Sequence, residues 1–137
     1  MALDIKKVEY FNITVGDHAG EGSKLLALFA ATGINLLAFK AIPLESNHTL
    51  FTLFPDDSSI MAKVVINKGI KLDGPHPALL IQGDDQSGAL ADIYEKLSRA
   101  NITVNESSGI ADINGAYGVV LYLSKEDCKK AMAVLYR

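Results

Sequence analysis

The sequence has a single cysteine, Cys128, no tryptophan and no long apolar run. One cysteine excludes a disulfide within the chain and a metal cluster built on cysteines, and the three histidines lack the spacing of a metal site. We therefore expect no metal and no other cofactor. No stretch approaches the ~18 apolar residues of a membrane span, and the N-terminus lacks a secretory signal. The sequence predicts a cytoplasmic protein with no membrane partner.

Positive charge is also scarce, with 13 Lys and Arg against 16 Asp and Glu, for a net charge of −3. The affinity of a protein for nucleic acid depends largely on basic groups that face phosphates. The predicted strands also lack the aromatic and basic residues that stack on and neutralise RNA. No nucleic-acid partner is therefore expected. Hydrophobic residues make up 49% of the 137 residues, which is enough for one domain or two small ones.

Apolar spacing predicts a regular order of elements in the first half of the chain. Asp56 and Asp57 stand where a helix favours negative charge at its N-terminus. The DGPHP cluster at 73–77 combines the strongest structure breakers of the chain, and we expect it to divide residues 1–74 from 75–137. The predicted elements are strands at 10–15, 34–44, 49–55 and 70–72, a helix at 20–32, and a second helix with Asp56 and Asp57 at its N-terminus that Gly69 ends.

The same order recurs after the breaker cluster, with strands at 78–82, 102–113 and 117–123 and helices at 88–100 and 125–136. Asn114-Gly115 predicts the turn of the second hairpin. The halves align without a gap at the spacing that separates Ile13 from Ile81, which we call the repeat offset. The identical residues fall in strand cores and in the first loop. They are Ile13/Ile81, Asp17/Asp85, Gly20/Gly88, Ile34/Ile102, Ile42/Ile110 and Leu53/Leu121. We infer a tandem repeat of two ferredoxin-like βαββαβ modules, an α/β fold of the α+β sandwich kind.

The second module lacks its own last strand, because its second helix ends where the sequence ends. Its sheet would therefore present an open edge, which proteins usually cover. We expect the N-terminal segment 2–7, or a partner chain, to fill this position.

The first loop, GDHAGEG at 16–22, could hold a phosphate, but its spacing does not match a P-loop or a dinucleotide fingerprint. Asp17 and Glu21 would also repel a phosphate. A simpler alternative is that Asp17 and Gly20 only shape a tight turn between strand and helix.

These residues resemble the ACT domain, a βαββαβ module of phosphoglycerate dehydrogenase, aspartokinase and other amino-acid-regulated enzymes. The resemblance rests on Asp17-x-x-Gly20, the helix after it and Thr32-Gly33-Ile34-Asn35-Leu36, and again on Asp85-x-x-Gly88 and Asn101-Ile102-Thr103-Val104. It implies that a small ligand, often an amino acid, binds where two modules meet. The ligand would contact the loop after the first strand and the start of the second strand.

The resemblance carries the ligand site to the first loop, to the start of the next strand and to the matching second loop. Asp17 suits an ammonium group, the helix N-terminus suits a carboxylate, and Asn35 both donates and accepts. Proline commonly precedes the loop glycine in the family, whereas Ala19 and Ser87 stand there in this chain. The candidate residues are Gly16, Asp17, His18, Ala19, Gly20, Gly22 and Asn35, with Asp85, Gln86, Ser87 and Gly88 in the second loop.

Gly22 departs from the family pattern, which has a sizeable apolar residue there, as Leu90 is in the second module. The space that it leaves is filled either by a neighbouring side chain, as dense packing favours, or by a ligand. Asn101 and Thr103 replace Gly33 and Asn35, so we do not expect the modules to bind identically. We favour the first loop.

The sequence therefore predicts a regulatory protein without catalytic activity that binds an amino acid or a similar metabolite. We expect a homodimer and, as a further partner, a separate enzyme that it regulates. Two alternatives remain. One is an interaction or oligomerisation module without a ligand. The other is an enzyme that uses the loop 16–22, for which no catalytic base is evident.

Overall fold

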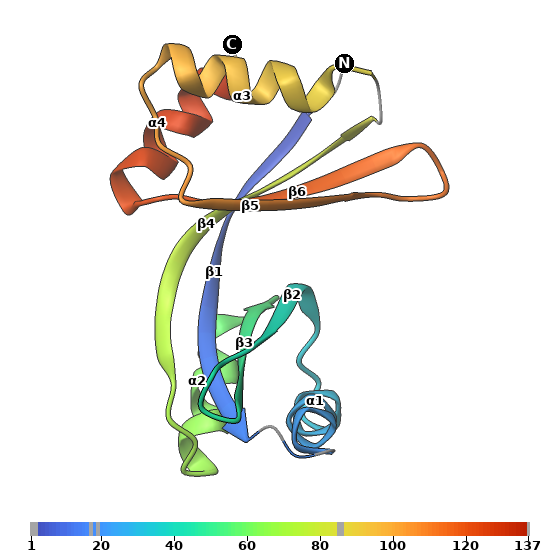
Figure 1. Cartoon of the computed structure of the whole chain (residues 1–137), viewed down its shortest axis with the longest axis vertical. Helices are drawn as coiled ribbons and strands as arrows, with labels where there is room; N and C mark the ends of the chain where they lie inside the picture. Colours follow the sequence, from blue (N-terminus) through green and yellow to red (C-terminus); the bar gives the residue numbers. More distant parts are fainter. Residues whose placement is uncertain (1–2, 17, 19, 85–86, 137) are drawn as a thin grey trace. The chain divides into compact units, whose positions relative to one another are not determined.

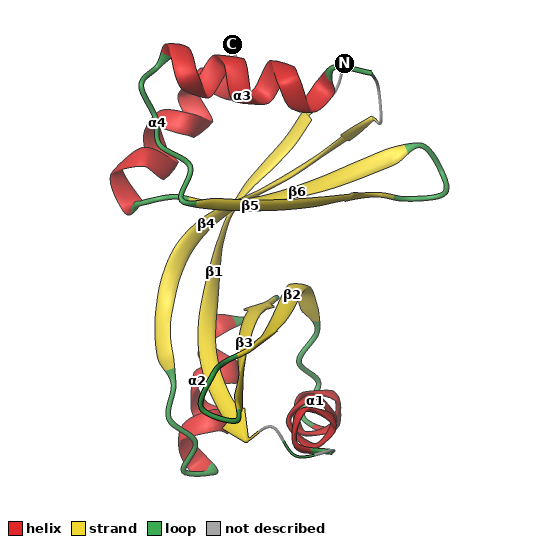
Figure 2. Cartoon of the chain, viewed as in Figure 1, coloured by secondary structure: helices red, strands yellow, loops and turns green. Residues whose placement is uncertain are grey.

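The computed structural model describes residues 3–16, 18, 20–84 and 87–136, and it has the expected order of strands and helices (Figures 1 and 2). Neighbouring strands follow the order β2-β3-β1-β4-β6-β5, so the α+β fold of two ferredoxin-like modules is confirmed. No helix among these residues is long and apolar enough to cross a membrane. The elements are β1 (Leu3–Gly16), α1 (Glu21–Ala31), β2 (Leu36–Pro43), β3 (His48–Pro55), α2 (Ser58–Asn67), β4 (Asp73–Asp84), α3 (Ala89–Arg99), β5 (Glu106–Ala111), β6 (Ala116–Tyr122) and α4 (Lys125–Leu135).

The chain divides into two compact units, which we call the first and the second module from here on. The first module is Glu9–His76, and the second module is Met1–Val8 together with Pro77–Arg137. This division differs from a single boundary at residue 74, because both long strands, β1 and β4, are shared between the modules. Each of the two strands gives one part of its length to each sheet.

The N-terminal part of β1 completes the sheet of the second module. Ile5 is only 4% exposed and packs in one core with Leu79, Ile81 and Leu121. The Ile5 N–H donates to the hydroxyl of Tyr136, and this hydroxyl donates to the Ile5 carbonyl, each at 3.1 Å. The expectation that the N-terminal segment takes the place of the missing last strand is therefore confirmed for its described residues, from Leu3 on.

Tyr136→Phe is expected to lower the free energy of unfolding by about 1 kcal/mol, because both hydrogen bonds to the edge of β1 are lost and water replaces them only in part. Urea unfolding followed by circular dichroism measures this change. An unchanged midpoint would show that the hydroxyl does not hold the strand.

The first module has its own core, in which Phe11, Ile13 and Leu53 of the sheet pack against Leu25 and Phe29 of α1. Met61 and Val65 of α2 close the same core. Most side chains on the buried faces of these elements follow the apolar spacing of the sequence. The first module thus has one hydrophobic core of its own, built from a contiguous segment of chain.

The last strand of the first module is not at 70–72, as the sequence predicted, but begins at Asp73. The breaker cluster at 73–77 is therefore part of β4 and does not interrupt the strand, and the division between the modules falls within it, after His76. Asn12 donates from Nδ2 to Asp73 at 3.2 Å, and the rings of Tyr10 and His76 lie 5.1 Å apart. Within the first module, residues 73–76 are the last segment in the strand order, next to β1. A strand at an edge tolerates proline, because the missing N–H need not pair.

The repeat offset is confirmed by the strand registers. Ile13 lies opposite Phe51 in the first module, and Ile81 lies opposite Val119 in the second. The offset fails at the last helix, because the N-caps are Asp57 and Ser124, whereas the offset pairs Asp57 with Lys125. The stretch from Leu121 to the N-cap of α4 is therefore one residue shorter than the stretch from Leu53 to the N-cap of α2, and the alignment has a gap there.

The turn of the second hairpin is longer than the expected two-residue turn at Asn114-Gly115. The Asp112 N–H donates to the Ala116 carbonyl at 2.8 Å and thus closes the loop at 112–116. The Asp112 carboxylate accepts the N–H groups of Asn114 and Ala116 at 2.8 and 3.0 Å. This side chain therefore stabilises a wider loop than the dipeptide alone specifies.

Candidate functional site

The first loop joins β1 to α1, and His18 and Gly20 are its exposed described residues. Gly16 ends β1, His18 is exposed, and the His18 carbonyl accepts the Glu21 N–H at 3.1 Å. Gly20 caps α1 in the left-handed conformation with φ of 93° and no side-chain hydrogen bond. Such a backbone favours glycine. Asp17 and Ala19, the other expected residues of this loop, lie outside the described residues.

A phenylalanine ring fills the space that Gly22 leaves. A Cβ placed on Gly22 would lie 2.7 Å from Cζ of Phe51, a distance that no real side chain tolerates. Phe51 is 7% exposed and belongs to the core of the first module. Of the two interpretations of Gly22, the structure therefore shows the neighbouring side chain.

Asn35 precedes β2 and is held through its backbone. Its N–H donates to the Asp56 carboxylate at 3.3 Å, and its carbonyl accepts the Asp56 N–H at 2.9 Å. These two hydrogen bonds tie the start of β2 to the turn before α2. Its side chain is exposed.

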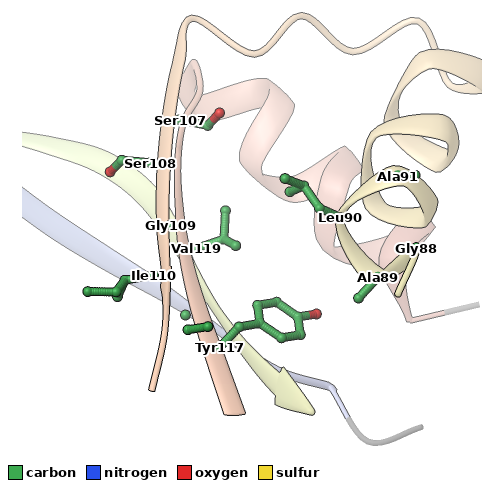
Figure 3. Close-up of a pocket in the computed structure, with 12 residues that line it drawn as sticks. Gly88, Ala89, Leu90, Ala91, Ser107, Ser108, Gly109, Ile110, Tyr117 and Val119 are labelled. Atoms are coloured by element: carbon green, nitrogen blue, oxygen red, sulfur yellow. The ribbon is translucent and has the colours of Figure 1, made fainter. Parts of the chain in front are cut away.

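Gly88 of the second loop lines a pocket of the second module. Ser87 and Gly88 are exposed, and Asp85 and Gln86 lie outside the described residues. Gly88 caps α3 with φ of 86° and no side-chain hydrogen bond. The pocket has a volume of about 490 Å³ and lies between the start of α3 and the hairpin of β5 and β6 (Figure 3). Its lining residues are Gly88, Ala89, Leu90, Ala91, Ser107, Ser108, Gly109, Ile110, Ala111, Tyr117, Gly118 and Val119.

Tyr117 gives this pocket an unusual polar group. The side chain is 9% exposed, and among the described residues its hydroxyl is buried without a hydrogen-bond partner. Buried polar groups are nearly always paired, because an unpaired one costs free energy. In Figure 3 the hydroxyl points toward the first residues of α3. Tyr117 therefore places a buried hydroxyl without a hydrogen-bond partner beside the pocket that this residue lines.

Burial raises the pKa of Tyr117, and the carboxylates of Asp92 and Asp84 raise it further. Both effects disfavour the phenolate. The hydroxyl is thus protonated at neutral pH and can donate a hydrogen bond. The N-terminus of α3 adds N–H groups that have no acceptor within the helix.

The opposite side of the pocket is held by a contact between α3 and β5, in which the hydroxyls of Tyr94 and Ser107 form a hydrogen bond. None of the lining residues that the structure describes carries a charge, and apart from hydroxyl groups their side chains are apolar. The described part of the chain has no group of His, Cys, Asp or Glu that could hold a metal ion.

Of the residues that the sequence indicated and the structure describes, only Gly88 lines this pocket. Sequence reasoning missed Tyr117, Ser107 and Val119, because it looked for ligand contacts in the loops and at the strand starts. The repeat offset carried a usable signal, since Phe51 and Phe39 of the first module correspond to Val119 and Ser107.

No family model and no curated protein matches the sequence. Solved structures match almost the whole chain. A protein from Bacteroides thetaiotaomicron has a TM-score of 0.82 at 19% identity and covers 96% of this chain and 88% of its own. Aspartokinase alpha and beta subunits reach 0.69 at 15% identity, covering 99% and 95%. The regulatory subunit of aspartate kinase from Thermus thermophilus reaches 0.66 at 13% identity, covering 98% and 93%.

The chain has the ACT-domain fold, in two copies. In each ACT module the helix after the first long strand begins at a left-handed glycine, Gly20 or Gly88. The pocket of the second module lies at the start of this helix, next to the loop to which the resemblance assigned the ligand. In the first module the matching place holds the ring of Phe51.

Proposed function

We propose that this protein is a regulatory protein without catalytic activity that binds an amino acid in the pocket of the second ACT module. The observation that carries the proposal is the buried, unpaired hydroxyl of Tyr117 at the wall of that pocket. This location differs from the first loop that the sequence favoured, because Phe51 already fills the space above Gly22.

The chemistry of the pocket suits an amino acid. Its carboxylate would accept hydrogen bonds from the N–H groups at the start of α3, where the helix dipole also favours a negative charge. The Tyr117 hydroxyl points to the same place and would donate one more. The negative charges of Asp84 and Asp92, which act on Tyr117, favour an ammonium group in this region.

A regulatory role is supported by the solved structures, among which are a regulatory subunit of aspartate kinase and a further putative regulatory domain of that enzyme. A ligand regulates by favouring one arrangement of a protein over another, through its different affinity for the two. We propose that the regulated enzyme is a separate chain. The homodimer and the cytoplasmic location stay predictions. Exposed apolar side chains on edge strands, Phe39 on β2 and Ile110 on β5, support the homodimer.

A thermal-shift screen with the twenty amino acids tests the proposal. A ligand at a hundred times its Kd adds about 2.7 kcal/mol to the stability of the native state. One or a few amino acids should therefore raise Tm by several degrees. If none of the twenty does so, the alternative of an interaction module without a ligand is favoured instead.

Tyr117→Phe is expected to weaken binding of the amino acid found in the screen by about tenfold or more, because a hydrogen bond to a charged group contributes about 1.5–3 kcal/mol. The unfolding midpoint of the free protein should not fall, since the hydroxyl has no partner to lose there. Calorimetric titration and urea unfolding measure the two effects.

Tyr136→Phe is the matched control, because it removes a hydroxyl of the same module that is hydrogen-bonded to Ile5. It should lower stability and leave affinity unchanged, which is the reverse of the pattern expected for Tyr117→Phe. Equal affinity of Tyr117→Phe and the wild type would contradict the proposed site.

A further inference from the structure

The two modules provide an internal comparison of the pocket, because the strand registers keep the repeat offset from Ala38 to Pro43 and from Glu106 to Ala111. Ala41 lies opposite Phe51 in the first module, and Gly109 lies opposite Val119 in the second. Each position in the wall of the pocket therefore has a known counterpart. The same backbone surrounds a pocket in one module and a filled space in the other.

The residues that face the helix are smaller in the second module. Phe51 corresponds to Val119, and Ala41 corresponds to Gly109. Phe39 pairs with Leu53, and Ser107 pairs with Leu121, so Phe39 corresponds to Ser107. These three changes remove two aromatic rings from one face of the sheet, so they account for the open volume.

The one change in the opposite direction does not close the pocket. Gly22 corresponds to Leu90, whose side chain is 52% exposed at its edge. In the first module the glycine is needed, because Phe51 lies directly against it. The space between helix and strand is thus lined by a small helix residue and a large strand residue in the first module, Gly22 and Phe51. In the second module it is lined by a large helix residue and a smaller strand residue, Leu90 and Val119.

The first module shows which kind of group fits between the helix and the strands. The group that occupies the space in the first module is a flat apolar ring attached to the protein itself, and it is almost completely buried. The open pocket is lined instead by Ala89, Val119 and the Tyr117 ring, and none of its described lining residues carries a charge. An apolar side chain of the ligand would bury its surface there, whereas a charged one would lose its hydration without a partner.

We infer that the second module binds an amino acid with a branched aliphatic or aromatic side chain, and that the first module binds none because Phe51 serves as its built-in occupant. The ligand side chain takes the place of the Phe51 ring, and its carboxylate meets the start of α3. This inference rests on the proposed function and specifies its ligand class and its stoichiometry of one ligand per chain.

The test is calorimetric titration of the full chain with L-leucine, L-isoleucine and L-phenylalanine and, for comparison, with L-aspartate and L-lysine. At least one apolar amino acid should bind at one molecule per chain. It should bind about tenfold or more tighter than either charged one, which corresponds to the gain from burying an apolar side chain. Phe51→Leu and Phe51→Val open the first module, and one of them should bind a second, weaker equivalent, since Thr49 replaces Tyr117 there.

Three results would overturn the inference. Binding of two equivalents by the wild type would show that Phe51 does not block the first module. Tighter binding of aspartate or lysine, lost in Tyr117→Phe, would leave the proposed function intact and refute the apolar ligand class. Failure of all twenty amino acids to bind would remove the proposed function itself. Two variants at position 51 are used in case one of them does not fold. Thermal melts identify such a variant, and the stoichiometry is then read from the other.

Discussion

Phenylalanine in place of Val119 is expected to abolish binding of the amino acid to the second module, with a loss of about a hundredfold or more, equivalent to about 2.7 kcal/mol. The ring would enter the pocket in the way that the Phe51 ring enters the matching space of the first module. Because Leu90 stands where the first module has Gly22, the variant Leu90→Gly/Val119→Phe reproduces the filled arrangement with less overpacking. Calorimetric titration measures the loss.

Val119→Ala is the matched control, because it enlarges the pocket and leaves the start of α3 and the Tyr117 hydroxyl in place. It should keep binding within about tenfold, since only two methyl groups are removed. The double variant should melt as one folded protein, which separates loss of the site from loss of the fold. If Leu90→Gly/Val119→Phe binds as well as the wild type, the ligand lies elsewhere.

Ile5→Ala is expected to lower the free energy of unfolding by about 2–5 kcal/mol, the usual cost of truncating an isoleucine in a core. Ile5 lies at the N-terminus, where truncation is ordinarily tolerated. Its side chain, however, is buried against Leu79 and Ile81 of the second module. Urea unfolding measures the change, and the loss should appear in the transition of the second module if the two modules unfold separately.

Lys7→Ala serves as the control in the same strand, because the Lys7 side chain is exposed. Such a surface change is expected to stay within about 0.5 kcal/mol. A loss from Ile5→Ala that is no larger than that from Lys7→Ala would contradict the assignment of the N-terminal strand to the core of the second module.

Local sequence patterns were sufficient for most of the fold. Apolar spacing located every helix to within a few residues. Negative charge at a helix start was expected for Asp56 and Asp57, and in the structure the Asp57 carboxylate caps α2 by accepting the N–H groups of Ser59 and Ile60. The repeat offset then supplied the order of strands. The start of β4 depended instead on partners distant in the sequence. Residues 73–76 form part of β4 in spite of Pro75, because they lie at an edge of the first module and Asn12 donates a hydrogen bond to Asp73.

The site was harder to predict than the fold. Gly20 and Gly88 look equivalent in the sequence, and both cap their helices in the same left-handed conformation. What distinguishes the two places is whether a side chain from β3 or β6 reaches the helix, as Phe51 does at Gly22. That contact joins residues far apart in the chain, so no local spacing reveals it. The unpaired state of the Tyr117 hydroxyl likewise depends on the surrounding three-dimensional packing.

The sharing of β1 between the modules also sets the order in which the chain can fold as it is synthesised. The first module is a contiguous segment, Glu9–His76, and all of its core is present once that segment has left the ribosome. The second module needs Ile5, whose hydrogen bonds to Tyr136 span 131 positions of the sequence. Contacts this distant in the sequence slow folding, because the entropy cost of closing a long loop comes before the stabilising contacts form. The start of β1 is therefore made before the first module but takes its place in the second module after the first module can fold.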